Sequence, residues 1–177
     1  MSRALVVFES MYGNTERIAE AVAGGLRQTL DVETCEVGAA AATFDRVELL
    51  VVGGPTHAHG MSSPSTRLSA AEKVEVPLRS TRLGIREWLA GLDGDFGSIA
   101  AAAFDTRVKG PAVLWGSAAR RAAAELRRLG FHEVVPPESF LVAFSPLEDA
   151  VVPGEVERAR AWGAGLAGKL PAFPGRR

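Results

Sequence analysis

The chain has 177 residues, of which 47% are hydrophobic and 23% charged, a globular composition with enough length for one sizeable core. Its 20 basic and 21 acidic residues leave a net charge of −1, which gives no global field for nucleic acid or an anionic membrane, so neither partner is expected. The single cysteine, Cys35, excludes an internal disulfide or a multi-cysteine metal site and favours a reducing, cytoplasmic location.

The first patterned segment is residues 4–8, a continuous apolar run. It suits a parallel strand covered on both faces and is far too short for a signal peptide or a membrane span. A helix is predicted next, because apolar residues recur at the spacing of one helical face: Ile18, Val22 and Leu26. Asn14 or Thr15 is expected to be its N-cap.

Two strands and a short helix follow. Residues 32–37 alternate as an edge strand does, and residues 49–52 are wholly apolar and end at Gly-Gly-Pro, residues 53–55. A helix is predicted over residues 64–72, because Ser63 precedes a proline and proline loses no needed N–H at the first helical position.

The second half repeats this alternation. A helix with one buried stripe is predicted at Ile85, Trp88, Leu89 and Leu92, and an alanine-rich strand over residues 98–104. Ser117 is expected to cap a helix that Gly130 ends. A strand over residues 140–144 and a helix over residues 156–166 complete the pattern.

Alternating strands and helices predict an α/β fold: a parallel sheet with helices on both faces. We expect a single domain over residues 1–170 and a flexible tail over residues 171–177.

The loop after the first strand, residues 10–15, reads Ser-Met-Tyr-Gly-Asn-Thr and is called the phosphate loop below. Its hydroxyls, side-chain amide and helix N–H groups suit a phosphate. It lacks the lysine of a P-loop and the glycines of a dinucleotide turn, so neutral donors are expected to hold a phosphate monoester. A polar turn with a good N-cap is the alternative.

Two loops together resemble the flavodoxin-like family. Residues 8–16, FESMYGNTE, are similar to the phosphate loop that follows the first strand in that family. Residues 53–61, GGPTHAHGM, resemble the Gly-x-Pro-Thr loop that borders the flavin in flavodoxins and related quinone reductases. The resemblance implies a flavodoxin-like, doubly wound, five-stranded parallel sheet of order 2-1-3-4-5, and FMN as the cofactor.

The resemblance also implies the cofactor-binding residues. The phosphate would lie against Ser10, Met11, Tyr12, Gly13, Asn14 and Thr15. The flavin ring would lie against Pro55, Thr56, His57, Ala58, His59 and Gly60, with Met61 closing that loop. The loop after the fourth strand would add Phe104, Asp105, Thr106 and Arg107.

This third loop departs from the family, which commonly places a ring-stacking tyrosine there. The only tyrosine of the chain, Tyr12, lies in the phosphate loop, so Phe104 or a histidine is the expected substitute. Arg107 and Lys109 outnumber Asp105, and a cation near the ring would stabilise the reduced flavin by about one to a few kcal/mol. We therefore predict a higher reduction potential than that of a low-potential flavodoxin, with pairing of Arg107 to Asp105 or to the phosphate as the alternative.

Two histidines and four arginines allow further interpretations. His57 and His59 could transfer protons or form a weak metal pair, but no third ligand is evident, so no metal site is expected. Four arginines of the helix after Ser117 form a solvated face, with docking to an acidic redox partner as the alternative: Arg120, Arg121, Arg127 and Arg128.

The favoured function is an FMN-dependent electron carrier, monomeric or homodimeric, between a reductase and an acceptor, because no spacing demands a catalytic residue. One alternative is an NAD(P)H-dependent FMN or quinone reductase, and another is a non-redox module that has lost FMN. The segment from residue 61 to residue 83 is expected to form a lid or a subunit contact.

Overall fold

The computed structural model describes the chain except for residues 1, 58–59, 73–78, 111–115, 144–149 and 172–177. A parallel sheet forms its centre, with strands in the order β2-β1-β3-β5, followed by β6 and β7, which both pair with β5. The four strands that lie side by side are, in chain order, β1 (Arg3–Phe8), β2 (Asp31–Glu36), β3 (Val47–His57) and β5 (Ala100–Val108). A short 3-10 helix, Val37–Ala39, takes the last residue of the predicted second strand.

The fifth position of the sheet holds two short strands in place of one. Strand β6 (His132–Glu133) pairs with the start of β5, and β7 (Glu138–Val142) pairs with its end. Pro136 and Pro137 lie between them and have no N–H to donate to a ladder, which interrupts the pairing. The predicted order 2-1-3-4-5 is thus confirmed, with the last strand divided.

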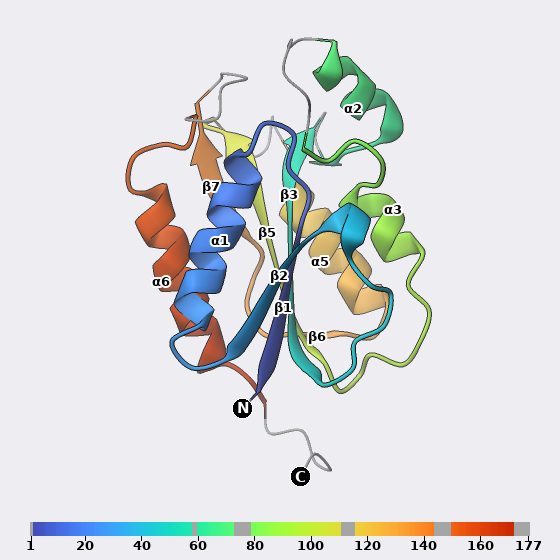
Figure 1. The fold of residues 1–177 in the computed structure, drawn as a ribbon, viewed down its shortest axis with the longest axis vertical. Coiled ribbons are helices and arrows are strands. Elements are labelled where there is room, and N and C mark those ends of the chain that lie inside the picture. The colour runs from blue at the N-terminus through green and yellow to red at the C-terminus, as the bar shows by residue number, and fades with distance from the viewer. Residues whose placement is uncertain (1, 58–59, 73–78, 111–115, 144–149, 172–177) are drawn as a thin grey trace.

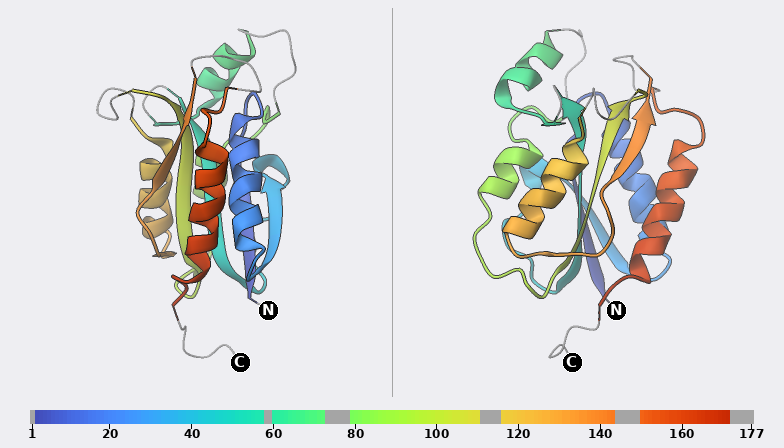
Figure 2. Two further views of the ribbon diagram at one scale, coloured as in Figure 1. Left: turned by 90° about the vertical axis from the view of Figure 1, so that its left-hand side faces the viewer. Right: turned by 180° about the vertical axis from the view of Figure 1, so that it is seen from behind.

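Helices cover both faces of the sheet (Figures 1 and 2). On one face lie α1 (Asn14–Leu26) and α6 (Glu155–Ala167), which pack together, and on the other lie α3 (Ile85–Ala90) and α5 (Ala118–Arg128). Helix α2 (Pro64–Ala71) stands beyond the carboxyl edge of the sheet. None of the described helices is long and apolar enough to cross a membrane.

Alternation along each strand divides the apolar side chains between two cores. In β1, Ala4 and Val6 face the core under α1 and α6, whereas Leu5 and Val7 face the core under α3 and α5. This arrangement requires the continuous apolar strands seen in the sequence, because both faces of a doubly wound sheet are buried.

Strands β3 and β5 extend beyond their predicted apolar segments. Their parallel register continues to Gly54 opposite Asp105 and Pro55 opposite Thr106. The two predicted ring loops therefore begin as neighbouring strand ends. A two-residue strand, β4 (Gly60–Met61), then turns back and pairs antiparallel with the end of β3.

The start of α2 and of α5 follows the sequence prediction. The Ser63 hydroxyl accepts the N–H of Thr66 at 3.3 Å, and the Ser117 hydroxyl accepts that of Arg120 at 3.2 Å. Of the predicted flexible tail, only residue 171 lies within the described residues.

Candidate functional site

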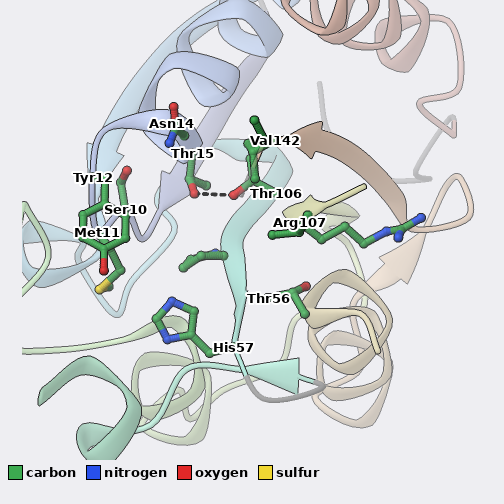
Figure 3. Close-up of a pocket in the computed structure, with 13 residues that line it drawn as sticks. Ser10, Met11, Tyr12, Asn14, Thr15, Thr56, His57, Thr106, Arg107 and Val142 are labelled. Atoms are coloured by element: carbon green, nitrogen blue, oxygen red, sulfur yellow. Dashed lines mark hydrogen bonds between the residues drawn. The ribbon is translucent and has the colours of Figure 1, made fainter. Parts of the chain in front are cut away.

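A cavity of about 270 Å³ opens at the carboxyl edge of the sheet (Figure 3). The phosphate loop borders one end of it, and the ends of β3, β5 and β7 border the other, which is called the ring end below. Its lining residues are Ser10, Met11, Tyr12, Asn14, Thr15, Pro55, Thr56, His57, Thr106, Arg107, Val108, Val142 and Ala143. Folding thus brings residues from all three predicted loops to one place.

The phosphate loop turns through Gly13, whose φ of 92° is a conformation that favours glycine. Gly13 itself is the N-cap of α1, so the prediction of Asn14 or Thr15 at that position was wrong. The capping oxygen comes from Ser10, whose hydroxyl accepts the N–H of Gly13 at 3.1 Å and of Glu16 at 3.3 Å. Among the described residues no acceptor is found for the hydroxyl proton of Ser10, which can therefore be donated to a bound anion.

Two threonine hydroxyls connect the phosphate loop to the ring end. Thr15, in the first turn of α1, and Thr106, in β5, lie with their Oγ1 atoms 2.7 Å apart, and both side chains are buried (Figure 3). This hydrogen bond fixes the spacing between the two ends of the cavity.

Part of the segment from residue 61 to residue 83 packs against the phosphate loop, a contact that the sequence analysis did not assign. The N–H of Ser80 donates to the Ser10 carbonyl at 2.8 Å, and the N–H of Arg79 donates to the Met11 carbonyl at 3.1 Å. In return, the Ser10 N–H donates to the Ser80 hydroxyl at 2.9 Å. Nothing in the spacing of residues 10–15 points to a partner so distant along the chain.

Arg79 adds a cation beside the phosphate loop that the sequence analysis did not assign. A Cβ placed on Gly13 would lie 3.1 Å from Nε of Arg79, so the guanidinium packs directly over this glycine. It forms an ion pair of 3.1 Å with Glu16 in the first turn of α1. A cation is therefore held beside the loop, although it does not line the cavity.

Tyr12 connects the same loop to α2. Its hydroxyl donates to the Ala70 carbonyl at 3.1 Å, and burial raises the pKa of this phenol. Tyr12 contacts α2, and Ser80 contacts Ser10. Both described parts of the segment between β3 and α3, residues 60–72 and 79–84, therefore contact the phosphate loop. Whether this segment closes over a ligand or contacts another subunit stays a prediction.

Asp105 organises the ring end without lining the cavity. Its carboxylate is fully buried and accepts hydrogen bonds from the Thr56 hydroxyl at 3.1 Å, the Ser117 hydroxyl at 2.6 Å and the Ala119 N–H at 2.9 Å. Thr56 in turn accepts the Ala118 N–H at 2.9 Å. These bonds fix the first turn of α5 to Thr56, which lines the cavity. They also place the Asp105 carboxylate at the N-terminus of α5, where the helix dipole favours negative charge.

Phe104 does not reach the cavity. Its ring is 1% exposed and packs against Phe140 and Trp162 in the core under α1 and α6. It fills the space over Gly53, where an added Cβ would lie 2.0 Å from the ring. The structure therefore does not bring Phe104 to the place of the missing tyrosine.

Other side chains line the ring end. The imidazole of His57 is directed into the cavity, and Val108, Val142 and Ala143 add apolar surface that the sequence analysis did not assign (Figure 3). The pairing of β7 with the end of β5 positions Val142, a signal that appears only once the fifth strand is known to pair there. Gly60 lies in β4 and does not line the cavity, and the predicted residues Ala58 and His59 lie outside the described residues.

Arg107 lines the cavity, but its guanidinium turns away from the centre (Figure 3). Its Nη1 donates to the Gly110 carbonyl at 2.9 Å, and among the described residues it forms no ion pair with Asp105. The cation is therefore held at the edge of the ring end by the carbonyl of Gly110, and the alternative of pairing with Asp105 is not what the structure shows, whereas pairing with the phosphate stays a prediction.

A buried ionic network lies behind the ring end. Glu9, which is 1% exposed, accepts from the Ser62 hydroxyl and from the Ile85 N–H at 2.9 Å. Arg67 lies 4.0 Å from Glu9 and forms an ion pair of 3.0 Å with Glu87. Burial raises the pKa of Glu9 above its ordinary value, and this effect outweighs the hydrogen bonds and the nearby guanidinium.

The donors and shape of the site fit a flavin mononucleotide. The hydroxyl groups of Ser10 and Thr15 lie in a loop that leads into a helix N-terminus, the usual surroundings of a phosphate group. The apolar ring end suits a flat heterocycle. Among the described residues, no group of three or more histidine, cysteine or acidic side chains could hold a metal ion.

Comparison with known families identifies the chain. The family model for flavodoxin matches residues 6–151, so the protein belongs to the flavodoxin family. FMN is the cofactor that membership of this family implies. No curated protein sequence matches this chain closely enough to count as a relative.

Solved structures confirm the fold. Flavodoxin 1 from Bacillus cereus has a TM-score of 0.69 at 20% identity, over 96% of this chain and 100% of that one. The flavodoxin of Streptococcus pneumoniae TIGR4 gives 0.65 at 19% identity, over 94% and 99%. A flavodoxin, WrbA-like protein from Agrobacterium tumefaciens gives 0.60 at 19% identity, over 95% and 96%.

Proposed function

We propose that this protein binds FMN in the cavity and carries electrons between a reductase and an acceptor. The observation that carries the proposal is the pairing of a phosphate-type donor set with an apolar ring end in one cavity. Bound FMN supplies one- and two-electron chemistry, and the chain's contribution is to bind and orient the cofactor and set its electrostatics.

In this proposal the phosphate loop confers the preference for a phosphorylated flavin. Ser10 holds the N–H groups of Gly13 and Glu16 and donates its own hydroxyl proton to a phosphate oxygen, and other N–H groups of the loop and of the first turn of α1 supply the remaining donors. Thr56 and His57 line one side of the ring and Val142 another, with Asp105 fixing Thr56 from behind.

A titration of the purified apoprotein tests cofactor binding. FMN and riboflavin, which lacks the phosphate, are added in parallel and followed by flavin absorbance and tryptophan fluorescence. We expect FMN to bind at least about a hundredfold more tightly, a difference of about 2.7 kcal/mol. Equal affinities would contradict the phosphate loop assignment, and no binding of either flavin would favour a non-redox module.

A second measurement separates a carrier from an enzyme. The FMN-loaded protein is mixed with NADH or NADPH and several quinones, with and without a separate flavodoxin reductase. A carrier is reduced only when the reductase is present. Steady-state oxidation of the nicotinamide without the reductase would replace the carrier proposal with that of an NAD(P)H-dependent reductase. We also propose a cytoplasmic location, because a chain with a single cysteine suits a reducing compartment.

A further inference from the structure

Five cations lie on segments beside the ring end of the cavity. They come from α3, from the end of β5 and the residue after it, and from the first turn of α5, and are called the basic rim: Arg86, Arg107, Lys109, Arg120 and Arg121. Arg107 is partly buried, and the other four are exposed. Because they belong to three separate segments, no local charge run in the sequence marks them as a group.

The basic rim is continuous with the cavity. Arg107 lines it, and Lys109 donates its backbone N–H to the carbonyl of Val142, which also lines it. The side chain of Arg121 crosses Gly60, where an added Cβ would lie 2.7 Å from its Cδ and Nε. Gly60 pairs with the cavity-lining residue His57.

Helix α3 supplies the remaining cation. Arg86 donates to the carbonyl of Ser62 at 2.9 Å and to that of Met61 at 2.6 Å, which holds it against the turn after β4. Carbonyl oxygens fix such a guanidinium in place but do not neutralise its charge.

Among the described residues of the segments that carry the basic rim, few acids offset it. Between residues 79 and 124 the sequence contains only Glu87, Asp93, Asp95 and Asp105 as acids. Glu87 pairs with Arg67, and Asp105 is fully buried. Asp93 and Asp95 lie in the segment that leads from α3 to the start of β5.

The two ends of α5 show the contrast on one helix. At its far end Arg127 pairs with Glu133, and Arg128 pairs with Glu125. At the cavity end, no described carboxylate pairs with Arg120 or Arg121. The unbalanced positive charge is therefore confined to the end of the helix beside the cavity.

We propose that the basic rim is the docking surface for an acidic electron-transfer protein, which it guides to the ring end of the cavity. This inference rests on the proposed electron-carrier function and specifies that the partner protein is negatively charged at its docking surface. Charge complementarity of this kind accelerates encounter and orients two redox proteins, and it weakens with salt because the contacts are solvent-exposed.

Charge reversal at the two ends of α5 tests the proposal. One variant carries Arg120→Glu and Arg121→Glu, and the matched control carries Arg127→Glu and Arg128→Glu. Both change the same helix and the net charge equally. The probes are an acidic plant-type [2Fe–2S] ferredoxin and basic cytochrome c, and binding to the FMN-loaded protein is measured by calorimetry between low and high salt.

We expect the wild type to bind the ferredoxin at low salt and to lose at least about tenfold in affinity at high salt. The rim variant should bind it at least about tenfold more weakly than the control does. Equal losses in the two variants, no binding of ferredoxin at low salt, or tighter binding of cytochrome c would overturn the proposal.

Two further measurements keep the result interpretable. The neutral variant Arg120→Gln and Arg121→Gln replaces the charge-reversed one if circular dichroism shows that the latter is unfolded, and it should weaken binding by at least about threefold. FMN titration of every variant separates the two proposals. If FMN binds tightly but the rim substitutions do not change ferredoxin affinity, only the docking proposal is contradicted. If FMN does not bind, the electron-carrier function is contradicted.

Discussion

The two ends of the cavity are built in different ways. The phosphate loop is one stretch of six residues that enters a helix, and Ser10 closes it through local hydrogen bonds to Gly13 and Glu16. The ring end is assembled from β3, β5 and β7 and held by Asp105. Recognition of a compact anion can thus be local, whereas a surface for a broad ring requires several strands.

The difference predicts where substitutions act. Changes at the phosphate loop should alter the preference for FMN over riboflavin, and changes behind the ring end should alter stability or potential. The following predictions test this division, from the largest expected effect to the smallest.

Removing the Asp105 carboxylate should have the largest effect. Asp105→Ala leaves the donors of Thr56, Ser117 and Ala119 without their acceptor, so we expect the free energy of unfolding to fall by about 3 kcal/mol or more. Chemical denaturation measures this change. Asp93→Ala, at an exposed carboxylate, is the control and should cost under about 0.5 kcal/mol; equal losses would contradict the role of Asp105.

Ser10→Ala should act on the phosphate. It removes the acceptor for two N–H groups and one donor to the anion, so FMN affinity should fall by about tenfold to a hundredfold, while riboflavin affinity changes less than about threefold. Parallel flavin titrations measure both. Ser69→Ala, at an exposed serine of α2, should change neither affinity, and a parallel loss of both flavins in the Ser10 variant would show that the effect is structural.

Arg107→Ala should lower the reduction potential of the FMN-loaded protein. Loss of a cation at the edge of the ring end removes stabilisation of the reduced, anionic cofactor, on the order of tens of millivolts. Potentiometric titration measures the change. Arg107→Lys retains the charge and should stay near the wild type, and identical potentials for all three proteins would contradict an electrostatic role.

Arg79→Gln should weaken FMN binding by about twofold to fivefold and reduce its dependence on salt, because a partly exposed cation beside the loop is screened. Titrations at several salt concentrations measure both effects. Arg82→Gln, at an exposed arginine nearby, is the control. The same salt dependence in all three proteins would mean that Arg79 only holds the loop in place.

Glu9→Gln should give the smallest change, in the pH dependence of stability. The pKa of Glu9 is raised in the folded state, so the folded protein binds the proton more tightly than the unfolded chain does. Its contribution to stability is complete below its unfolded pKa and is lost as pH rises through the folded one. Denaturation from pH 4 to pH 8 should therefore show the variant gaining on the wild type as pH rises, and parallel curves would contradict this.

Much of the fold followed from the sequence because its signals are local. Apolar runs such as residues 4–8 predicted buried parallel strands, and Ser63 and Ser117 predicted helix starts. The phosphate loop was also evident, since its donors are adjacent along the chain and lead into a helix. Local hydrogen bonds and hydrophobic periodicity act over a few residues, within reach of a sequence pattern.

Only the tertiary structure decided which distant residues meet. The packing of Phe104 over Gly53 removed a candidate for the ring, and the pairing of β7 with β5 added Val142 to the cavity. Arg79 reached the phosphate loop through backbone hydrogen bonds between segments far apart in the chain. Such contacts depend on strand register and on the space that neighbouring side chains leave, which the sequence determines only through the whole fold.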